Sequence, residues 1–130
     1  MEFPDDILYS VEHTWVKVEG DLATMGITEF MLEDAGEILS AELPSEGEEV
    51  NQFEIFATLE SERAVTELIS PISGEIIEVN ADIATDPEII TTDPYHHGWI
   101  AIVKIEDIDE TRELMTATEY SRYVNEQKIS

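Results

Sequence analysis

Five consecutive residues, Glu60-Ser61-Glu62-Arg63-Ala64, carry the clearest chemical signal in the sequence. They lie between two runs of β-forming residues, 53–59 and 65–69, so we expect a β-hairpin with Arg63 at its tip. A guanidinium stays protonated and is a poor nucleophile toward an acyl group. It can, however, hold a carboxylate through two parallel hydrogen bonds. Arg63 is therefore either a solvated charge, paired loosely with nearby glutamates, or a contact point for a partner.

The three histidines are the other candidate ligands. His96 and His97 follow Tyr95 in an expected loop, and His13 could supply a third nitrogen to a metal ion. Adjacent histidines in an extended chain point in different directions, and no spacing brings His13 to them, so we expect a solvated loop and no metal site. The sequence also contains no cysteine, no glycine-rich phosphate loop and no nucleophile elbow. We therefore predict no catalytic residue.

The composition is that of an acidic globular protein. The chain has 130 residues, of which 42% are apolar, and we expect residues 1–130 to form one domain. Thirty-one acidic and six basic residues give a formal charge of −25, which argues against nucleic acid or an anionic membrane as a partner. The acids are scattered, which is typical of a solvated surface, and a high-salt habitat stays open. We see no signal peptide and no membrane-spanning run, so we expect a cytoplasmic protein.

Most apolar residues follow the two-residue period of β-strands. Glu19-Gly20-Asp21 has the chemistry of a turn, and it should join two strands into a hairpin. The expected strands cover residues 15–18, 22–27, 37–43, 50–59, 65–70, 75–80 and 99–105. A short repeat, Gly-Glu-Ile followed by an aliphatic residue, occurs at 36–39 and at 74–77 and suggests a quasi-two-fold sandwich, although so short a match could also arise by chance.

Short helices should interrupt the strands and follow them. The expected helices are 29–35 after the cap Thr28, 87–90 after the cap Asp86, and 109–114 after the cap Asp109. Thr116 and Glu119 have the spacing of a capping box for a final helix. The C-terminal helical segment is thus expected at about 109–126.

Landmarks along nearly the whole chain resemble those of the H protein of the glycine cleavage system. They are Glu-His-Thr-Trp-Val at 12–16, Ala-Thr-Met-Gly-Ile-Thr at 23–28, Glu-Leu-Pro at 42–44, Leu-Glu-Ser at 59–61, Ser-Pro-Ile-Ser-Gly-Glu-Ile at 70–76, Glu-Val-Asn at 78–80, Asp-Pro-Tyr at 93–95 and Gly-Trp at 98–99. The resemblance covers about residues 7–126. It implies a mainly β fold, the lipoyl/biotinyl-type β-sandwich or barrel-sandwich hybrid, with short helices and a C-terminal helix.

The resemblance also implies a carrier that is not itself an enzyme. Family members bear lipoate in amide linkage on a lysine at the hairpin tip, and this arm visits glycine decarboxylase, aminomethyltransferase and dihydrolipoyl dehydrogenase. Here Arg63 stands at that lysine's position, so we expect it to be unmodified and we predict no cofactor. The three lysines, Lys17, Lys104 and Lys128, lie outside the expected hairpin tip and should be surface charges.

The residues around Arg63 match the family pattern at some positions and differ from it at others. Thr14 replaces an acid that lies near the loaded arm in the family, and Glu62 replaces a small or β-branched apolar residue. The site residues that the resemblance carries over, besides Arg63, are Glu60, Ser61, Glu67 and His13. His13 is best explained by packing, and Glu67 supplies an acid where the family often has Asp.

Three functions follow from these observations. The first is a non-lipoylated binding module for glycine-cleavage or lipoate-handling enzymes, because the scaffold is kept while the carrier amine is missing. The second is a true H protein whose carrier lysine was replaced by engineering or in a degenerate copy. The third is an enzyme with a site near His13 and Glu67, but no set of nucleophile, base and orienting group supports it.

Overall fold

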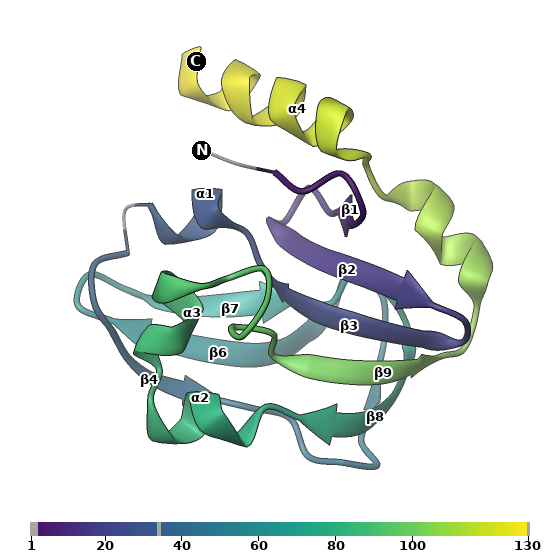
Figure 1. Ribbon diagram of the computed structural model, residues 1–130, viewed down its shortest axis with the longest axis horizontal. Helices are drawn as coiled ribbons and strands as arrows, with labels where there is room; N and C mark the ends of the chain where they lie inside the picture. Colours follow the sequence, from purple (N-terminus) through teal and green to yellow (C-terminus); the bar gives the residue numbers. More distant parts are fainter. Residues whose placement is uncertain (1–2, 34, 130) are drawn as a thin grey trace.

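The strands form two antiparallel sheets in the computed structural model, which describes residues 3–33 and 35–129 (Figure 1). The larger sheet has the order β1-β2-β3-β9-β8-β5, and the smaller has the order β4-β6-β7. The strands are β1 Leu8–Tyr9, β2 Thr14–Glu19, β3 Leu22–Ile27, β4 Ile38–Glu42, β5 Glu49–Val50, β6 Ile55–Ser61, β7 Val65–Ile69, β8 Gly74–Val79 and β9 Ala101–Ile105. The two copies of the short repeat lead into β4 and β8, one in each sheet.

Both hairpins expected from turn residues are present. In the first, Glu19 pairs with Leu22, which leaves Gly20 and Asp21 as a two-residue loop between β2 and β3. Gly20 has a φ of +64°, a conformation that glycine adopts without steric cost. The second hairpin joins β6 to β7, with Glu60 opposite Val65 as its last pair, and it carries the Arg63 tip.

The inner faces of the two sheets enclose an apolar core. Met25 of β3, Leu68 of β7 and Ile76 of β8 are fully buried there, together with Ile72 from the turn between β7 and β8. Burial of each such side chain stabilises the fold by about 1.5–3 kcal/mol. This core holds the β6–β7 hairpin in place against the six-stranded sheet.

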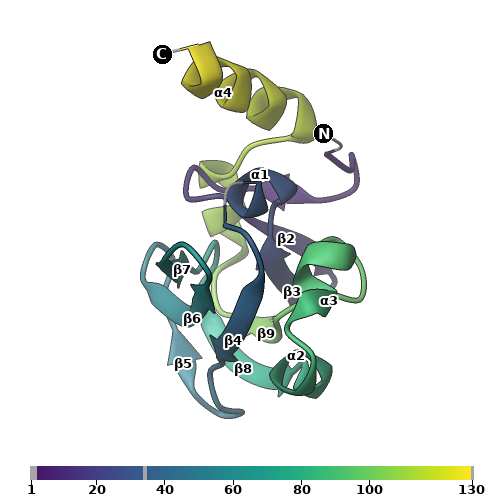
Figure 2. The same cartoon turned by 90° about the vertical axis from the view of Figure 1, so that its left-hand side faces the viewer.

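A second apolar cluster attaches the C-terminal helix α4, Ala117–Ile129, to the end of the molecule that carries β1 (Figure 1), and Figure 2 shows α1 at the same end. The rings of Tyr9 and Tyr120 stack with centroids 4.6 Å apart and planes 7° apart. The expected capping box is confirmed, because Thr116 N–H donates to Glu119 Oε1 at 2.9 Å and Glu119 N–H donates to Thr116 Oγ1 at 3.2 Å. In the described part of the chain, none of the helices is long and apolar enough to cross a membrane.

The short helices differ from the expectation in their caps. Helix α2, Ala81–Thr85, was not predicted, and Asn80 caps it by accepting a hydrogen bond from Asp82 N–H. Asp86 therefore ends α2, and Pro87 rather than Asp86 is the N-cap of α3, Glu88–Thr92.

Two further elements have shifted bounds. Helix α1, Glu29–Leu32, keeps its predicted cap Thr28 but is shorter than expected. The segment expected as a helix from Asp109 is a 3₁₀ helix, η1 Ile108–Glu113, and its cap is Asp107. The expected mainly β fold with short helices and a C-terminal helix is nevertheless confirmed.

Candidate functional site

The hairpin tip is a four-residue turn from Ser61 to Ala64. Ser61 N–H and Ser61 Oγ–H donate to the Ala64 carbonyl oxygen at 2.9 and 3.0 Å, and Ala64 N–H donates to Ser61 Oγ at 3.3 Å. Glu62 and Arg63 are the two central residues, and both are exposed. Ser61, predicted as a site residue, is buried and uses its hydroxyl to close the turn.

The residue before Arg63 fastens the tip to the loop that precedes β4. Glu62 N–H donates to the carbonyl oxygen of Glu37 at 3.0 Å, and a carboxylate oxygen of Glu62 accepts a hydrogen bond from Glu37 N–H at 2.7 Å. The two residues therefore exchange a pair of hydrogen bonds, which we call the tip clamp. Sequence reasoning missed it, because its partners are 25 residues apart and no local pattern marks Glu37.

Gly36 leaves room for this arrangement. It has a φ of +75°, and a Cβ at this position would lie 2.9 Å from Glu62 Oε1 and 3.5 Å from Arg63 Nη1. The guanidinium of Arg63 thus lies back against the loop before β4, close to the backbone of Gly36. Only glycine suits both the backbone conformation and the close approach of the two side chains.

Two exposed apolar side chains flank the tip. Val65 is 64% exposed and lies opposite Glu60, and Leu39 is 51% exposed and lies at the bulge where β4 pairs with Glu60 and Ser61. We call Leu39, Glu62, Arg63 and Val65 the tip surface. It combines a cation with apolar area, a combination that suits a protein contact.

The remaining site residues predicted near Arg63 are only partly brought together. Glu60 is beside the tip, and Glu67 is exposed on β7 two residues beyond Val65, on the same face of the strand. Next to the turn, a pocket lined in part by Ser61, Thr66 and Leu59 has a volume of only about 10 Å³. That volume admits at most one water molecule.

His13 belongs to a separate network at the base of α4. Its Nδ1 lies 2.7 Å from the Tyr120 hydroxyl, which in turn lies 2.8 Å from Thr28 Oγ1. The ring also packs 4.7 Å from Phe30, centroid to centroid. Burial lowers the pKa of His13, partly offset by the charge of Glu12. The packing role expected for His13 therefore has a specific form, in which it connects β2 to α4 and α1.

The side chain of Thr14 also has a structural role. It is fully buried, its hydroxyl donates to the carbonyl oxygen of Ile69 at 2.9 Å, and Ser10 Oγ lies 2.7 Å from it. The hydroxyl therefore joins β2 of the large sheet to the end of β7 in the small sheet. In this chain, the residue at position 14 contributes a hydrogen bond between the two sheets.

His96 and His97 both contact Asp93. Their Nδ1 atoms lie 3.1 and 2.7 Å from its two carboxylate oxygens, and both rings are largely exposed. Partial burial alone would raise the pKa of Asp93, but the hydrogen bonds from His97 and His96 outweigh it and lower the pKa. Within residues 3–33 and 35–129, no group of three or more histidine, cysteine, aspartate or glutamate side chains is arranged so that it could hold a metal ion.

Comparisons with known proteins agree with the geometry. The sequence model of the family described as "Glycine cleavage H-protein" matches residues 7–127. The glycine cleavage system H protein of Halothermothrix orenii is 38% identical over 126 residues, which cover 97% of this chain and 98% of that protein. The crystal structure of a glycine cleavage system H protein from Mycobacterium marinum superposes with a TM-score of 0.86 at 36% identity, covering 93% of this chain and 98% of the other.

Proposed function

Because the chain belongs to the glycine cleavage H-protein family, we propose that it is a non-enzymatic protein of the carrier fold that acts as a non-lipoylated binding module. The observation that carries this proposal is Arg63 at the tip of the β6–β7 hairpin, where the family's lipoyl lysine is expected. An amide with lipoate needs an amine that can lose its proton, and a guanidinium does not provide one. The turn therefore does not fit the family's cofactor.

The lysines elsewhere in the chain do not replace the missing amine. Lys17 lies within β2, with its Nζ 3.7 Å from a carboxylate oxygen of Asp6, and Lys104 lies within β9. Lys128 belongs to α4, and its side chain is outside the described part of the structure. None of these backbone positions is a hairpin turn, so none presents an amine as the family's carrier lysine is presented.

The tip surface is the proposed contact site. The tip clamp holds the turn in one conformation, which reduces the entropy that binding has to remove. The guanidinium of Arg63 suits a partner carboxylate, and the exposed side chains of Val65 and Leu39 suit an apolar neighbour of it. The partners we propose are the cytoplasmic glycine-cleavage enzymes or enzymes that transfer lipoate, with no role for nucleic acid or membrane.

Intact-mass measurement tests the missing modification. The chain is expressed together with a lipoate ligase and with lipoate in the medium, beside the variant Arg63→Lys and a lipoylated H protein as positive control. We expect no added lipoyl group on the native chain. A gain of one lipoyl group on the native chain would contradict the proposal. If Arg63→Lys becomes lipoylated and fully active as an aminomethyl shuttle, the second function, a degenerate true H protein, is favoured.

Binding to the purified partner enzymes tests the contact site. Arg63→Ala should weaken the productive interaction by at least about tenfold, as loss of a central arginine often does. Arg112→Ala is the matched control, because this exposed arginine lies in η1 outside the tip surface. If Arg63→Ala and Arg112→Ala bind equally well, Arg63 does not contribute to the interface.

A further inference from the structure

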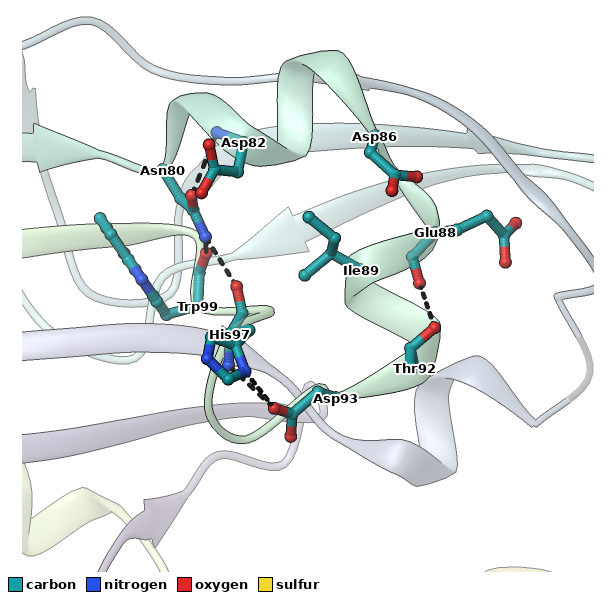
Figure 3. A pocket seen from close by; sticks show the side chains of 9 residues that line it. All are labelled: Asn80, Asp82, Asp86, Glu88, Ile89, Thr92, Asp93, His97 and Trp99. Atoms are coloured by element: carbon teal, nitrogen blue, oxygen red, sulfur yellow. Dashed lines mark hydrogen bonds and ion pairs between the residues drawn. The ribbon is translucent and has the colours of Figure 1, made fainter.

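A pocket of about 450 Å³ lies among α2, α3 and the loop before β9 (Figure 3). Its apolar lining comes mainly from Ile89 and Trp99, and its acidic lining residues are Asp82, Asp86, Glu88 and Asp93, of which Glu88 directs its carboxylate away from the space beside Ile89 (Figure 3). Figure 3 shows the side chain of Ile89 directed into the space between Asp82 and Asp93. The volume is in the range of pockets that take a small ligand or one large side chain. The pocket shares no residue with the tip surface.

Hydrogen bonds and close packing preform this pocket. Asn80 is 5% exposed, and its amide nitrogen donates to the carbonyl oxygens of His97 and Trp99, both at 2.8 Å. Gly98 lies against α3 so closely that a Cβ there would be 2.7 Å from the carbonyl oxygen of Asp93. The loop 97–99 is therefore fixed against α2 and α3, and a ligand would meet a formed wall.

Only some of the acidic residues that line the pocket are paired with other groups of the protein. Glu88 accepts a hydrogen bond from Ile38 N–H at 3.2 Å, and Asp93 holds His96 and His97. Within the described residues, the carboxylates of Asp82 and Asp86 form no ion pair. A cation entering the pocket would thus find two carboxylates without an internal partner.

The chemistry of these lining residues indicates which kind of cation the pocket would take. Among the described residues, no group of three acidic or histidine side chains could hold a metal ion. Separated carboxylates around an apolar wall suit an extended organic cation, whose carbon chain can lie on Ile89 while its charged end reaches the rim. Arginine fits best, because its planar guanidinium binds carboxylates in bidentate fashion and is more weakly hydrated than an ammonium group.

We propose that this pocket receives an arginine side chain of a protein partner. Charge complementarity supports an arginine within a polypeptide rather than free arginine, since the free amino acid would bring its own α-carboxylate to a rim that carries Asp82 and Asp86. The proposal does not depend on whether Arg63 can be lipoylated, so it stands or falls separately from the proposed function.

Titration by NMR with the peptide acetyl-Gly-Arg-Gly-amide tests the proposal on the full chain. We expect saturable shifts centred on the amides of residues 82–99, and no comparable saturation with the citrulline peptide, which keeps the shape and loses the charge. Free arginine and the lysine peptide should bind more weakly than the arginine peptide. Equal binding of the citrulline peptide, tighter binding of free arginine, or absence of saturation would overturn the proposal.

Variants distinguish the pocket from the general acidity of the surface. Asp82→Asn and Asp86→Asn should each weaken binding of the arginine peptide by about fivefold, the loss expected for one partly exposed charge pair. Glu46→Gln, an exposed acid in the turn before β5, is the matched control and should leave the affinity unchanged. If Glu46→Gln weakens binding as much as Asp86→Asn does, the peptide is only a diffuse counterion and the proposal fails.

Discussion

The carboxylate of Glu62 accepts a hydrogen bond from the backbone N–H of Glu37 at 2.7 Å, while Glu62 N–H donates to the Glu37 carbonyl oxygen at 3.0 Å. This clamp joins the hairpin tip to the loop before β4. The side chain of Glu62 is thereby engaged with the protein's own backbone, and Arg63 is held beside it. The clamp gives the tip a defined shape, and its loss should be measurable.

Glu62→Ala should lower the free energy of unfolding by about 1 kcal/mol, because one exposed hydrogen bond with a charged acceptor is lost. Urea denaturation measures the change, and hydrogen exchange of the Glu37 amide should become faster. Glu60→Ala is the control, since Glu60 is exposed next to the same turn and lies outside the clamp. Similar losses in both variants would mean that the clamp contributes nothing specific.

Gly36→Ala should destabilise the protein more than Gly47→Ala. Both glycines have positive φ, +75° and +87°, so both substitutions cost about 1 kcal/mol of backbone strain. Only at Gly36 would the new Cβ lie 2.9 Å from Glu62 Oε1, whereas no atom lies within 4 Å of a Cβ at Gly47.

The extra cost at Gly36 should shrink when Glu62 is also changed to alanine. Thermal or urea unfolding of the four variants forms a double-mutant cycle that isolates the coupling between the two residues. If Gly36→Ala costs no more than Gly47→Ala, the close approach of Glu62 to Gly36 is not a real constraint.

Much of the fold could be predicted, because local patterns determine it. Alternating apolar residues marked the strands, Gly20 marked a hairpin turn, and Thr116 with Glu119 marked the start of α4. The family was predicted from landmarks spread over the chain, and the comparisons show it. The signals for the strands, the turn and the helix start each lie within a few residues of the feature that they predict.

Two of the missed features depend on long-range contacts. The clamp joins residues 25 apart, and the link between His13 and Tyr120 joins residues 107 apart. Helix α2 was missed because Asn80 was read as the end of a strand, although its side chain caps the helix and fixes the loop 97–99. The tip clamp and the contact of His13 with Tyr120 leave no local pattern in the sequence, whereas the Asn80 cap was a local signal that was misread.

The half-buried histidine His13 predicts a dependence of stability on pH. Burial lowers the pKa of His13 from its ordinary value of 6.5, and the nearby Glu12 raises it in part. As the pH falls below 6.5, the His13 imidazole therefore becomes protonated in the unfolded chain while it is still mostly neutral in the folded chain. The contribution of His13 is fully present above the unfolded pKa and is lost as the pH falls toward the folded pKa.

His13→Asn should flatten this dependence. Asparagine tolerates the φ of +68° found at position 13, and it does not titrate. Urea denaturation at pH 7.5 and 5.5 should show a smaller loss of stability on acidification than in the native chain. His97→Gln is the control, because His97 is largely exposed. An unchanged loss in His13→Asn would show that other groups cause the pH dependence.

Thr14→Val should destabilise the protein by about 1–2 kcal/mol, because the buried Thr14 hydroxyl no longer donates to the carbonyl oxygen of Ile69 while the volume of the side chain is kept. Thr14→Ser keeps the hydroxyl and should cost less. The free energies of unfolding of the two variants, measured by urea denaturation, test this difference. Thr14→Val as stable as the native chain would mean that the hydroxyl is not needed to join the two sheets.

Tyr120→Phe should cost about 1–2 kcal/mol, because the buried hydroxyl contacts both His13 Nδ1 and Thr28 Oγ1 and its removal leaves both without this partner. The ring remains, so the stack with Tyr9 is kept and the loss reports the hydrogen bonds alone. Tyr123→Phe is the matched control on the same helix, since its exposed hydroxyl makes a single hydrogen bond to the carbonyl oxygen of Val11 at 3.3 Å. We expect that control to change stability by less than about 0.5 kcal/mol. Equal effects of the two substitutions would mean that the network of His13, Tyr120 and Thr28 does not anchor α4, and that apolar packing alone holds the helix.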